Sequence, residues 1–334
     1  MLLVTAYVFV VPSLPATIEK AAVLLSQGSG STPTQNLQFY SPEILNGSAD
    51  LLFPSDYGDL ANYTLGLINQ DRSDFGLGSV TLSPIQSGEQ HADSMLRYGY
   101  FSHYDTQGYK PYMRYTLLGG TGAVFENVAY VSYSRSRYST AGTVEDDLKF
   151  LEYSMMYNDS ACCNNGHRIN ILNPMHDRVS IGIAYNSTTL FFVEDFENYY
   201  ANMSISLSKT LAVTMTGILL NPQISASQVF IAYDSSPTTL TPSQLDSLPH
   251  EYTPGTGVGG VIPKSACAIY PIDCPTFQTG ATVYVGIWQF GVSGIDISFS
   301  LSAFVNQNGP GVYTIYLTGS NLSSALTSYS VFVQ

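Results

Sequence analysis

The chain has 334 residues, about two domains' worth, and its apolar fraction of 45% is ample for packed cores. Acidic residues outnumber basic ones by 25 to 12, so the formal charge is -13, yet only 11% of residues are charged. This composition argues against disorder, and 12 scattered basic residues cannot neutralise a nucleic-acid backbone. A surface of neutral, hydroxyl-bearing residues, including 25 tyrosines, indicates an extracellular protein and suits an acidic habitat.

The N-terminal stretch, residues 1–25, begins with an apolar run from Met1 to Leu14 that contains no Lys or Arg. The run is shorter than the roughly 20 residues that span a bilayer. It resembles the apolar core of a secretory signal whose charged start is missing. An ordinary N-terminal strand or helix is the alternative. Residues 26–58 are expected to form a linker, because their first part is rich in Ser, Gly and Thr.

Three helices are expected in the next part of the chain. Apolar spacing predicts the first over residues 59–70. Ser83, as a cap, and Pro84, at the first turn, predict the start of a second helix that runs to about Tyr98. Residues 142–157 predict a third, with acidic residues in its first turn where the helix dipole favours them.

Strand patterns follow these helices. Residues 178–186 and 189–196 are β-branched and aromatic runs separated by a short polar turn, which predicts a hairpin. After about residue 203 helical spacing disappears, and turns at 237–242 and 255–260 separate short alternating runs. These runs are residues 204–208, 228–233, 283–288, 295–304, 312–317 and 328–333. The pattern predicts an antiparallel, immunoglobulin-like β-sandwich over residues 203–334, after an α+β domain over residues 59–202.

Six Asn-x-Ser/Thr sequons favour a secreted glycoprotein, although Ser/Thr-rich chains also contain them by chance. The acceptor residues are Asn46, Asn62, Asn158, Asn186, Asn202 and Asn321.

Four cysteines allow three disulfide pairings. Neighbouring Cys162 and Cys163 would strain the peptide between them if they were bridged. The other two schemes link this pair to Cys267 and Cys274, so we expect two bridges that staple the domains together. The alternative is a local Cys267–Cys274 loop, with the other two cysteines free or bonded to each other.

Four of the five histidines fall between residues 91 and 176, within a set of ordered motifs. These motifs are Leu82-Ser83-Pro84, His91-Ala92, Tyr100-Phe101-Ser102-His103, Glu126-Asn127-Val128-Ala129, Gly166-His167-Arg168-Ile169-Asn170-Ile171-Leu172 and Ile181-Gly182-Ile183. Their order resembles the CAP superfamily of cysteine-rich secretory proteins, antigen 5 and pathogenesis-related proteins, most closely its prokaryotic secreted branch. The resemblance covers about residues 59–200.

This resemblance implies an α-β-α sandwich with a cleft that holds two histidines and two acidic residues. His103, Glu126 and His167 match three of these positions. The fourth, an acidic residue before the second histidine, has no clean match, and Asp159 or Glu152 could supply it. Phe125 also replaces the Gly that commonly precedes the Glu-Asn pair.

Such a set of side chains supports three kinds of role. His103, His167 and Glu126 could ligate a zinc or calcium ion, although no cofactor is required. The same groups could act as general acid and base, or they could be purely architectural. His91 is expected to be a half-buried, hydrogen-bonded residue and only secondarily a ligand, His176 a surface turn residue, and His250 is given no role.

The sequence thus predicts a secreted or cell-surface protein with a non-enzymatic binding role. Its partner would be an extracellular protein, a glycan or a lipid. The alternatives are a metal-assisted peptidase or other hydrolase, and a structural surface subunit. No membrane span is expected beyond the N-terminal signal.

Overall fold

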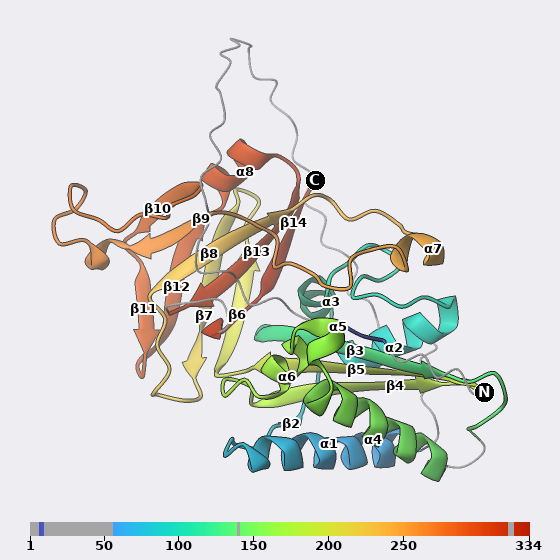
Figure 1. Ribbon diagram of the computed structural model, residues 1–334. Coiled ribbons are helices and arrows are strands. Elements are labelled where there is room, and N and C mark those ends of the chain that lie inside the picture. The colour runs from blue at the N-terminus through green and yellow to red at the C-terminus, as the bar shows by residue number, and fades with distance from the viewer. Residues whose placement is uncertain (1–6, 10–55, 139–140, 320–323) are drawn as a thin grey trace.

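A helix-and-sheet half is followed along the chain by a β-rich half (Figure 1), so the fold is mixed α+β as predicted. The computed structural model describes residues 7–9, 56–138, 141–319 and 324–334. Most of the expected N-terminal segment and linker lies outside these residues. Within them, no helix is both long and apolar enough to cross a membrane.

The first half is built on a five-stranded sheet of order β1-β3-β5-β4-β2. All neighbours are antiparallel except β2 and β4, which are parallel. The β4–β5 pairing confirms the predicted hairpin, and Tyr7–Phe9 adds an edge strand against β3. The strands are β1 (Tyr7–Phe9), β2 (Thr81–Leu82), β3 (Ala123–Ser132), β4 (Arg178–Tyr185) and β5 (Thr189–Asn198).

Helices cover both faces of this sheet. Ala129 and Phe192 share an apolar cluster with α1 (Tyr57–Asp74) and α4 (Ala141–Tyr157). Their chain neighbours Val128 and Val193 pack against α2 (Ser87–Tyr98) instead. Because successive strand residues point to opposite faces, the half has three layers. Three short helices complete it: α3 (Pro111–Leu117), α5 (Ser160–Cys163) and α6 (Gly166–Ile171).

The second helix begins later than predicted. Ser83 is not its cap, because the Ser83 hydroxyl donates to Glu197 and accepts the amide of Ile85. The helix starts at Ser87, after Gln86. Ser83, which sequence spacing predicts as the helix cap, is instead hydrogen-bonded to Glu197, a buried acid on β5.

Two further sheets form the β-rich half. Their orders are β10-β9-β8-β13-β14 and β11-β12-β7-β6. One apolar core joins them, with Ile231 and Ile315 from the first sheet and Met215 and Ile297 from the second. The strands are β6 (Ala201–Leu207), β7 (Ala212–Leu219), β8 (Gln228–Asp234), β9 (Thr256–Pro263), β10 (Ala281–Val285), β11 (Trp288–Gly291), β12 (Gly294–Ser300), β13 (Gly311–Thr318) and β14 (Tyr329–Val333). Short helices are α7 (Pro242–Leu245), the 3-10 turn η1 (Lys264–Ala266) and α8 (Ser302–Asn308).

Three strand predictions need correction here. The glycine-rich stretch at 255–260 is mostly strand β9, which pairs in parallel with β10, so the sandwich is not wholly antiparallel. A Cβ on Gly259 would lie 1.9 Å from the Ala281 carbonyl oxygen, so glycine permits close strand approach there rather than a turn. The predicted strand 295–304 ends at Ser300 and gives way to α8, and β7 was not predicted.

The predicted disulfide staple is wrong. Cys267 and Cys274 are bonded to each other, which closes a local loop within the β-rich half. Cys163 is also disulfide-bonded, and therefore not to either of them. The side chain of Cys162 lies outside the described residues.

The sequons whose residues are described all lie on the surface. Asn62, Asn158, Asn186 and Asn202 are exposed. Asn46 and Asn321 lie outside the described residues. Glycosylation stays a prediction.

Polar contacts rather than disulfides join the two halves. Lys110, at the start of α3, places its Nζ 2.7 Å from Asp234 Oδ1 on β8 and donates to the carbonyl of Thr253 at 3.0 Å. Tyr112 donates to the other oxygen of Asp234 at 2.7 Å. The Lys110 and Asp234 side chains are largely buried, so this ion pair is held in a low-dielectric interface.

Removal of Asp234 tests this interface. We expect Asp234→Ala to lower the free energy of unfolding by about 3 kcal/mol, because it leaves the Lys110 ammonium buried without its partner. This loss in the free energy of unfolding can be measured by urea denaturation. The transition is followed by far-UV circular dichroism and by the fluorescence of the single tryptophan, Trp288. Asp93→Ala, which breaks an i,i+4 pair with the exposed Arg97, should cost at most about 0.5 kcal/mol. Equal losses in the two variants would contradict the prediction.

Candidate functional site

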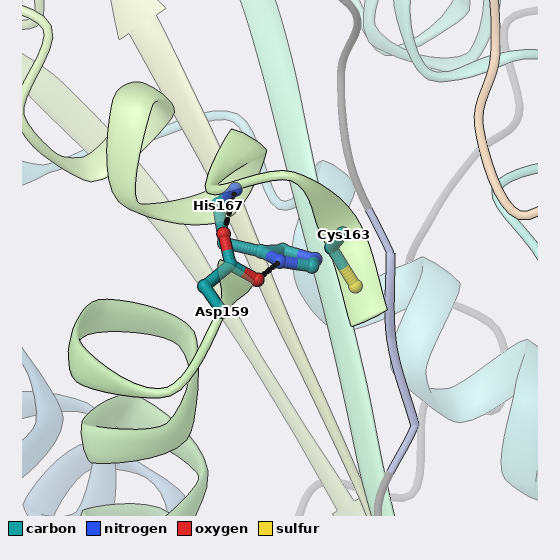
Figure 2. A group of neighbouring side chains, drawn as sticks. All are labelled: Asp159, Cys163 and His167. Atoms are coloured by element: carbon teal, nitrogen blue, oxygen red, sulfur yellow. Dashed lines mark hydrogen bonds and ion pairs between the residues drawn. The ribbon is translucent and has the colours of Figure 1, made fainter. Parts of the chain in front are cut away.

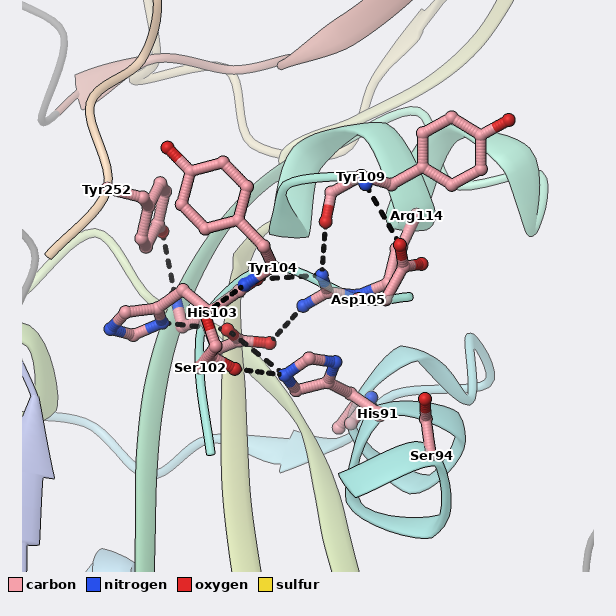
Figure 3. A network of polar contacts seen from close by, with 12 residues as sticks. His91, Ser94, Ser102, His103, Tyr104, Asp105, Tyr109, Arg114 and Tyr252 are labelled. Carbon is pink, nitrogen blue, oxygen red and sulfur yellow. Dashed lines mark hydrogen bonds and ion pairs between the residues drawn. The ribbon is translucent and has the colours of Figure 1, made fainter. Parts of the chain in front are cut away.

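His103 and Glu126 form a buried hydrogen-bonded pair (Figure 3). His103 lies in the segment between α2 and α3, and its Nδ1 is 2.8 Å from Glu126 Oε1 on β3. Neither side chain is exposed to solvent. The structure therefore brings together two of the residues that the motifs predict.

Arg114 also contacts Glu126, although sequence analysis did not identify this arginine. It lies on α3, and its Nη2 is 2.5 Å from Glu126 Oε2. Its Nη1 donates to the carbonyl oxygens of His103 and Tyr109, both at 2.8 Å. One guanidinium thus fixes the carboxylate and the segment that carries His103.

Burial sets the protonation states of these groups. It lowers the pKa of His103 to about 3, with the nearby Arg114 charge as the next cause, so the imidazole is neutral. Burial also raises the pKa of Glu126 to about 7, although Arg114 opposes the rise. The His103–Glu126 contact is therefore a hydrogen bond to a neutral imidazole rather than an ion pair.

His91 and Tyr252 border the pair. His91 is fully buried on α2, where its Nε2 is 2.8 Å from the Ser102 carbonyl oxygen, so it is hydrogen-bonded as expected but more deeply placed. Tyr252 comes from the β-rich half, and its Oη accepts the backbone N–H of Glu126 at 3.1 Å. The Tyr252 ring lies 4.9 Å from the imidazole of His103, measured between centroids. Both halves of the chain therefore contribute to this site.

A second buried pair joins His167 and Asp159 (Figure 2). His167 Nδ1 is 2.6 Å from Asp159 Oδ1, and the backbone N–H of His167 donates to Asp159 Oδ2 at 2.9 Å. Asp159 directly precedes α5, and His167 lies in the first turn of α6. The carboxylate thus holds both the ring and the backbone of His167. Burial lowers the pKa of His167, although Asp159 opposes this.

The two pairs lie close enough to interact electrostatically, since a charge on His103 would lower the pKa of His167. Of the two candidates for the fourth acidic position, Asp159 contacts a predicted histidine directly. Glu152, on α4, instead lies beside Glu194 and Asp71. The arrangement is two separate His–carboxylate pairs.

Asp195 is a further buried acid that sequence analysis missed. It lies opposite Glu126 in the β3–β5 pairing. Burial, with the charge of Glu126 as the next cause, raises its pKa well above the ordinary value. The available signal was the stretch Glu194-Asp195-Phe196-Glu197, three acids within a buried strand of a weakly charged chain.

His176 is not the surface turn residue that was predicted. It is buried, with Nδ1 2.8 Å from Asn198 Oδ1 and Nε2 2.9 Å from Asn170 Oδ1. Its ring stacks on Phe196 at a centroid distance of 5.1 Å. Two distant asparagines satisfy the imidazole, and a local sequence pattern does not show such partners. His250, which was given no role, is exposed.

The described residues do not form the three-ligand metal site that the motifs predict. The one group among them with three His, Cys, Asp or Glu ligand atoms within 4.8 Å of one another is Asp159, Cys163 and His167. Cys163 is disulfide-bonded and offers no thiolate, and Asp159 is already bonded to His167 Nδ1. The predicted trio of His103, Glu126 and His167 does not form such a group. His167 Nε2 is one of several buried side-chain atoms in the described residues that have no hydrogen-bond partner.

Three of the cavities that border the described residues have volumes of about 630, 590 and 290 Å³. The largest follows the outer side of α6, along Arg168 and Ile169. The smallest lies beside Phe101 and Tyr130. None of the three is lined by His103, Glu126 or His167.

Comparisons with known proteins give a partial likeness to solved structures. No family model and no curated protein matches the chain. A solved structure described as an extracellular protein containing a SCP domain, from Bacillus anthracis, is 20% identical over 44% of this chain, with a TM-score of 0.31. The match also spans 44% of that chain, less than half of its length.

The role of Arg114 can be tested by its pH signature. Arg114→Met should lower the free energy of unfolding by about 3 kcal/mol at pH 8, where Glu126 is ionised and loses its cation. The loss should be smaller at pH 5, below the folded-state pKa of about 7, because the carboxyl is then protonated in both proteins. Chemical denaturation at the two pH values measures both losses.

Arg97→Met is the matched control, because Arg97 is an exposed arginine that pairs with Asp93 on the same helix. It should change stability by at most about 0.5 kcal/mol at either pH. An Arg114→Met loss that is the same at pH 5 and pH 8 would show that the guanidinium acts only through its two carbonyl contacts.

Proposed function

We propose that the chain is a secreted or cell-surface CAP-like protein that acts by binding rather than by catalysis. The ordered motifs around His103, Glu126 and His167, the three-layer first half and the exposed sequons support this proposal. Its β-rich half is proposed to be an immunoglobulin-like sandwich that helps to form the site.

One observation carries the binding role: the Nε2 atom of His167 is buried and has no hydrogen-bond partner. Asp159 accepts the Nδ1 proton, which leaves a lone pair on Nε2. Buried polar atoms are normally satisfied, so an isolated acceptor of this kind is what a ligand would complete. The ligand would present a hydrogen-bond donor or a cation at this nitrogen.

The carboxylates argue against hydrolysis. Glu126 is committed to His103 and Arg114, and Asp159 to the ring and backbone of His167. A general base must reach the water or proton that it activates. Neither acid has that freedom in this arrangement, so the hydrolase alternative is not favoured.

Zinc is a suitable probe of the unpaired lone pair on His167 Nε2. We expect wild-type protein to bind zinc at pH 7 by calorimetry, and His167→Ala to lose at least about tenfold in affinity because the nitrogen is gone. His176→Gln is the control, because both nitrogens of His176 are already hydrogen-bonded. That variant should keep wild-type affinity.

Two results would contradict the proposal in different ways. Equal zinc affinity in wild type and His167→Ala would leave the His–carboxylate pairs as architecture without a binding role. Turnover of peptide or glycan libraries that falls at least tenfold in His167→Ala would establish an enzyme instead.

A further inference from the structure

Three carboxyl groups from three different elements lie close together where α1 and α4 pack on the central sheet. Asp71 lies on α1, Glu152 on α4 and Glu194 on β5. Glu194 is fully buried and Glu152 is 2% exposed, whereas Asp71 is half-buried and accepts a hydrogen bond from Tyr157 at 2.6 Å. We call these three acids the carboxyl bridge.

The carboxyl bridge lacks donors if its members are ionised. Both oxygens of Glu152 and Oε1 of Glu194 are buried without a hydrogen-bond partner. Yet Glu152 lies within hydrogen-bonding reach of both Asp71 and Glu194. Two carboxylates cannot bond to each other, because neither has a proton to donate. Protons shared between the neighbouring carboxyl groups of Asp71, Glu152 and Glu194 would give these oxygens hydrogen-bond partners.

The groups that surround the bridge do not neutralise it. Asn127 on β3 donates to Glu194 Oε2 at 3.0 Å, and Tyr157 on α4 donates to Asp71. Asp74 on α1 adds a further negative charge beside Asp71. Burying an unbalanced charge is costly, so the neutral forms are favoured.

A metal ion fits this site less well than protons do. Asp71, Glu152 and Glu194 do not bring three ligand atoms together, since in the described part of the chain only Asp159, Cys163 and His167 do so. Calcium and magnesium require at least six oxygen ligands around one point. A proton requires only two facing oxygens.

We propose that the carboxyl bridge is a proton-dependent tie that holds α1 and α4 against the central sheet, and that it releases these helices as the pH rises. Asn127, which donates to Glu194 at 3.0 Å, also accepts a hydrogen bond from Asn170 Nδ2 on α6 at 2.9 Å. The bridge is therefore linked to α6 as well as to the central sheet.

The direction in which stability changes with pH follows from the difference in proton binding between the folded and unfolded states. Burial raises the pKa of Glu194 to about 7, and it raises the pKa values of Glu152 and Asp71 as well. The folded state therefore holds more protons than the unfolded state above the ordinary carboxyl pKa near 4.5. Stability is full below that pH and is lost as the pH rises through about 7.

Glu152→Gln is the decisive variant, because an amide donates to Asp71 and Glu194 at any pH. We expect its melting temperature to equal that of wild type at pH 4 and to exceed it by about 5 °C at pH 8. Asp146→Asn is the matched control, an exposed acid on the same helix, and should show the wild-type pH dependence. Differential scanning calorimetry measures all three proteins.

A Glu152→Gln variant that loses stability with pH as steeply as wild type would overturn the proposal. So would calcium that restores wild-type stability at pH 8, because a metal would then be the occupant. If Glu152→Gln does not fold, hydrogen exchange on wild-type protein decides. Amides of α1 and α4 should lose protection between pH 5 and pH 8, after correction for intrinsic rates, more than those of α2. Equal changes in all three helices would refute the tie.

Discussion

The antiparallel pairing of β3 with β5 is the constraint on which the rest of the first half depends. It sets Glu126 opposite Asp195 and Asn127 opposite Glu194. Paired residues share a face and successive residues alternate, so one acidic pair faces α2 while the next polar pair faces α4. A slip of one residue would exchange the two faces and separate every acid from its partners.

The two faces deal with their buried acids in different ways. On the α2 face Arg114 supplies a cation to Glu126, and His103 stays neutral beside it. On the α4 face no cation acts on Glu194 or Glu152 among the causes of their raised pKa values, and only an amide donates to Glu194. The first arrangement has a cation to balance Glu126 once this acid ionises, above a pKa of about 7, whereas the second depends on bound protons. The same sheet thus carries one buried acid that is balanced by a cation and another whose charge is removed by bound protons.

Sequence analysis predicted what local patterns encode. The β4–β5 hairpin and the helices around 59–70 and 142–157 follow from spacing. It missed Arg114 and Asp195, because their partners are set by strand register and not by nearby residues.

Local patterns gave wrong predictions where one residue type is compatible with two different structures. Glycines at 255–260 read as a turn but allow close strand pairing, and Cys267 pairs with its near neighbour Cys274 in place of a distant partner. Disulfide connectivity is not fixed by spacing alone, so both schemes were compatible with the sequence.

The β-rich half completes the site and is more than an attached domain. Residue Glu126 lies on β3, and its backbone N–H needs a partner that β5 does not supply. Tyr252 fills this need from the segment between β8 and β9, and its ring also covers His103. The Lys110–Asp234 contact fixes α3, the helix that carries Arg114, to β8. The position of the guanidinium that balances Glu126 therefore depends on the second half of the chain, so the two halves must fold together for the first pair to form.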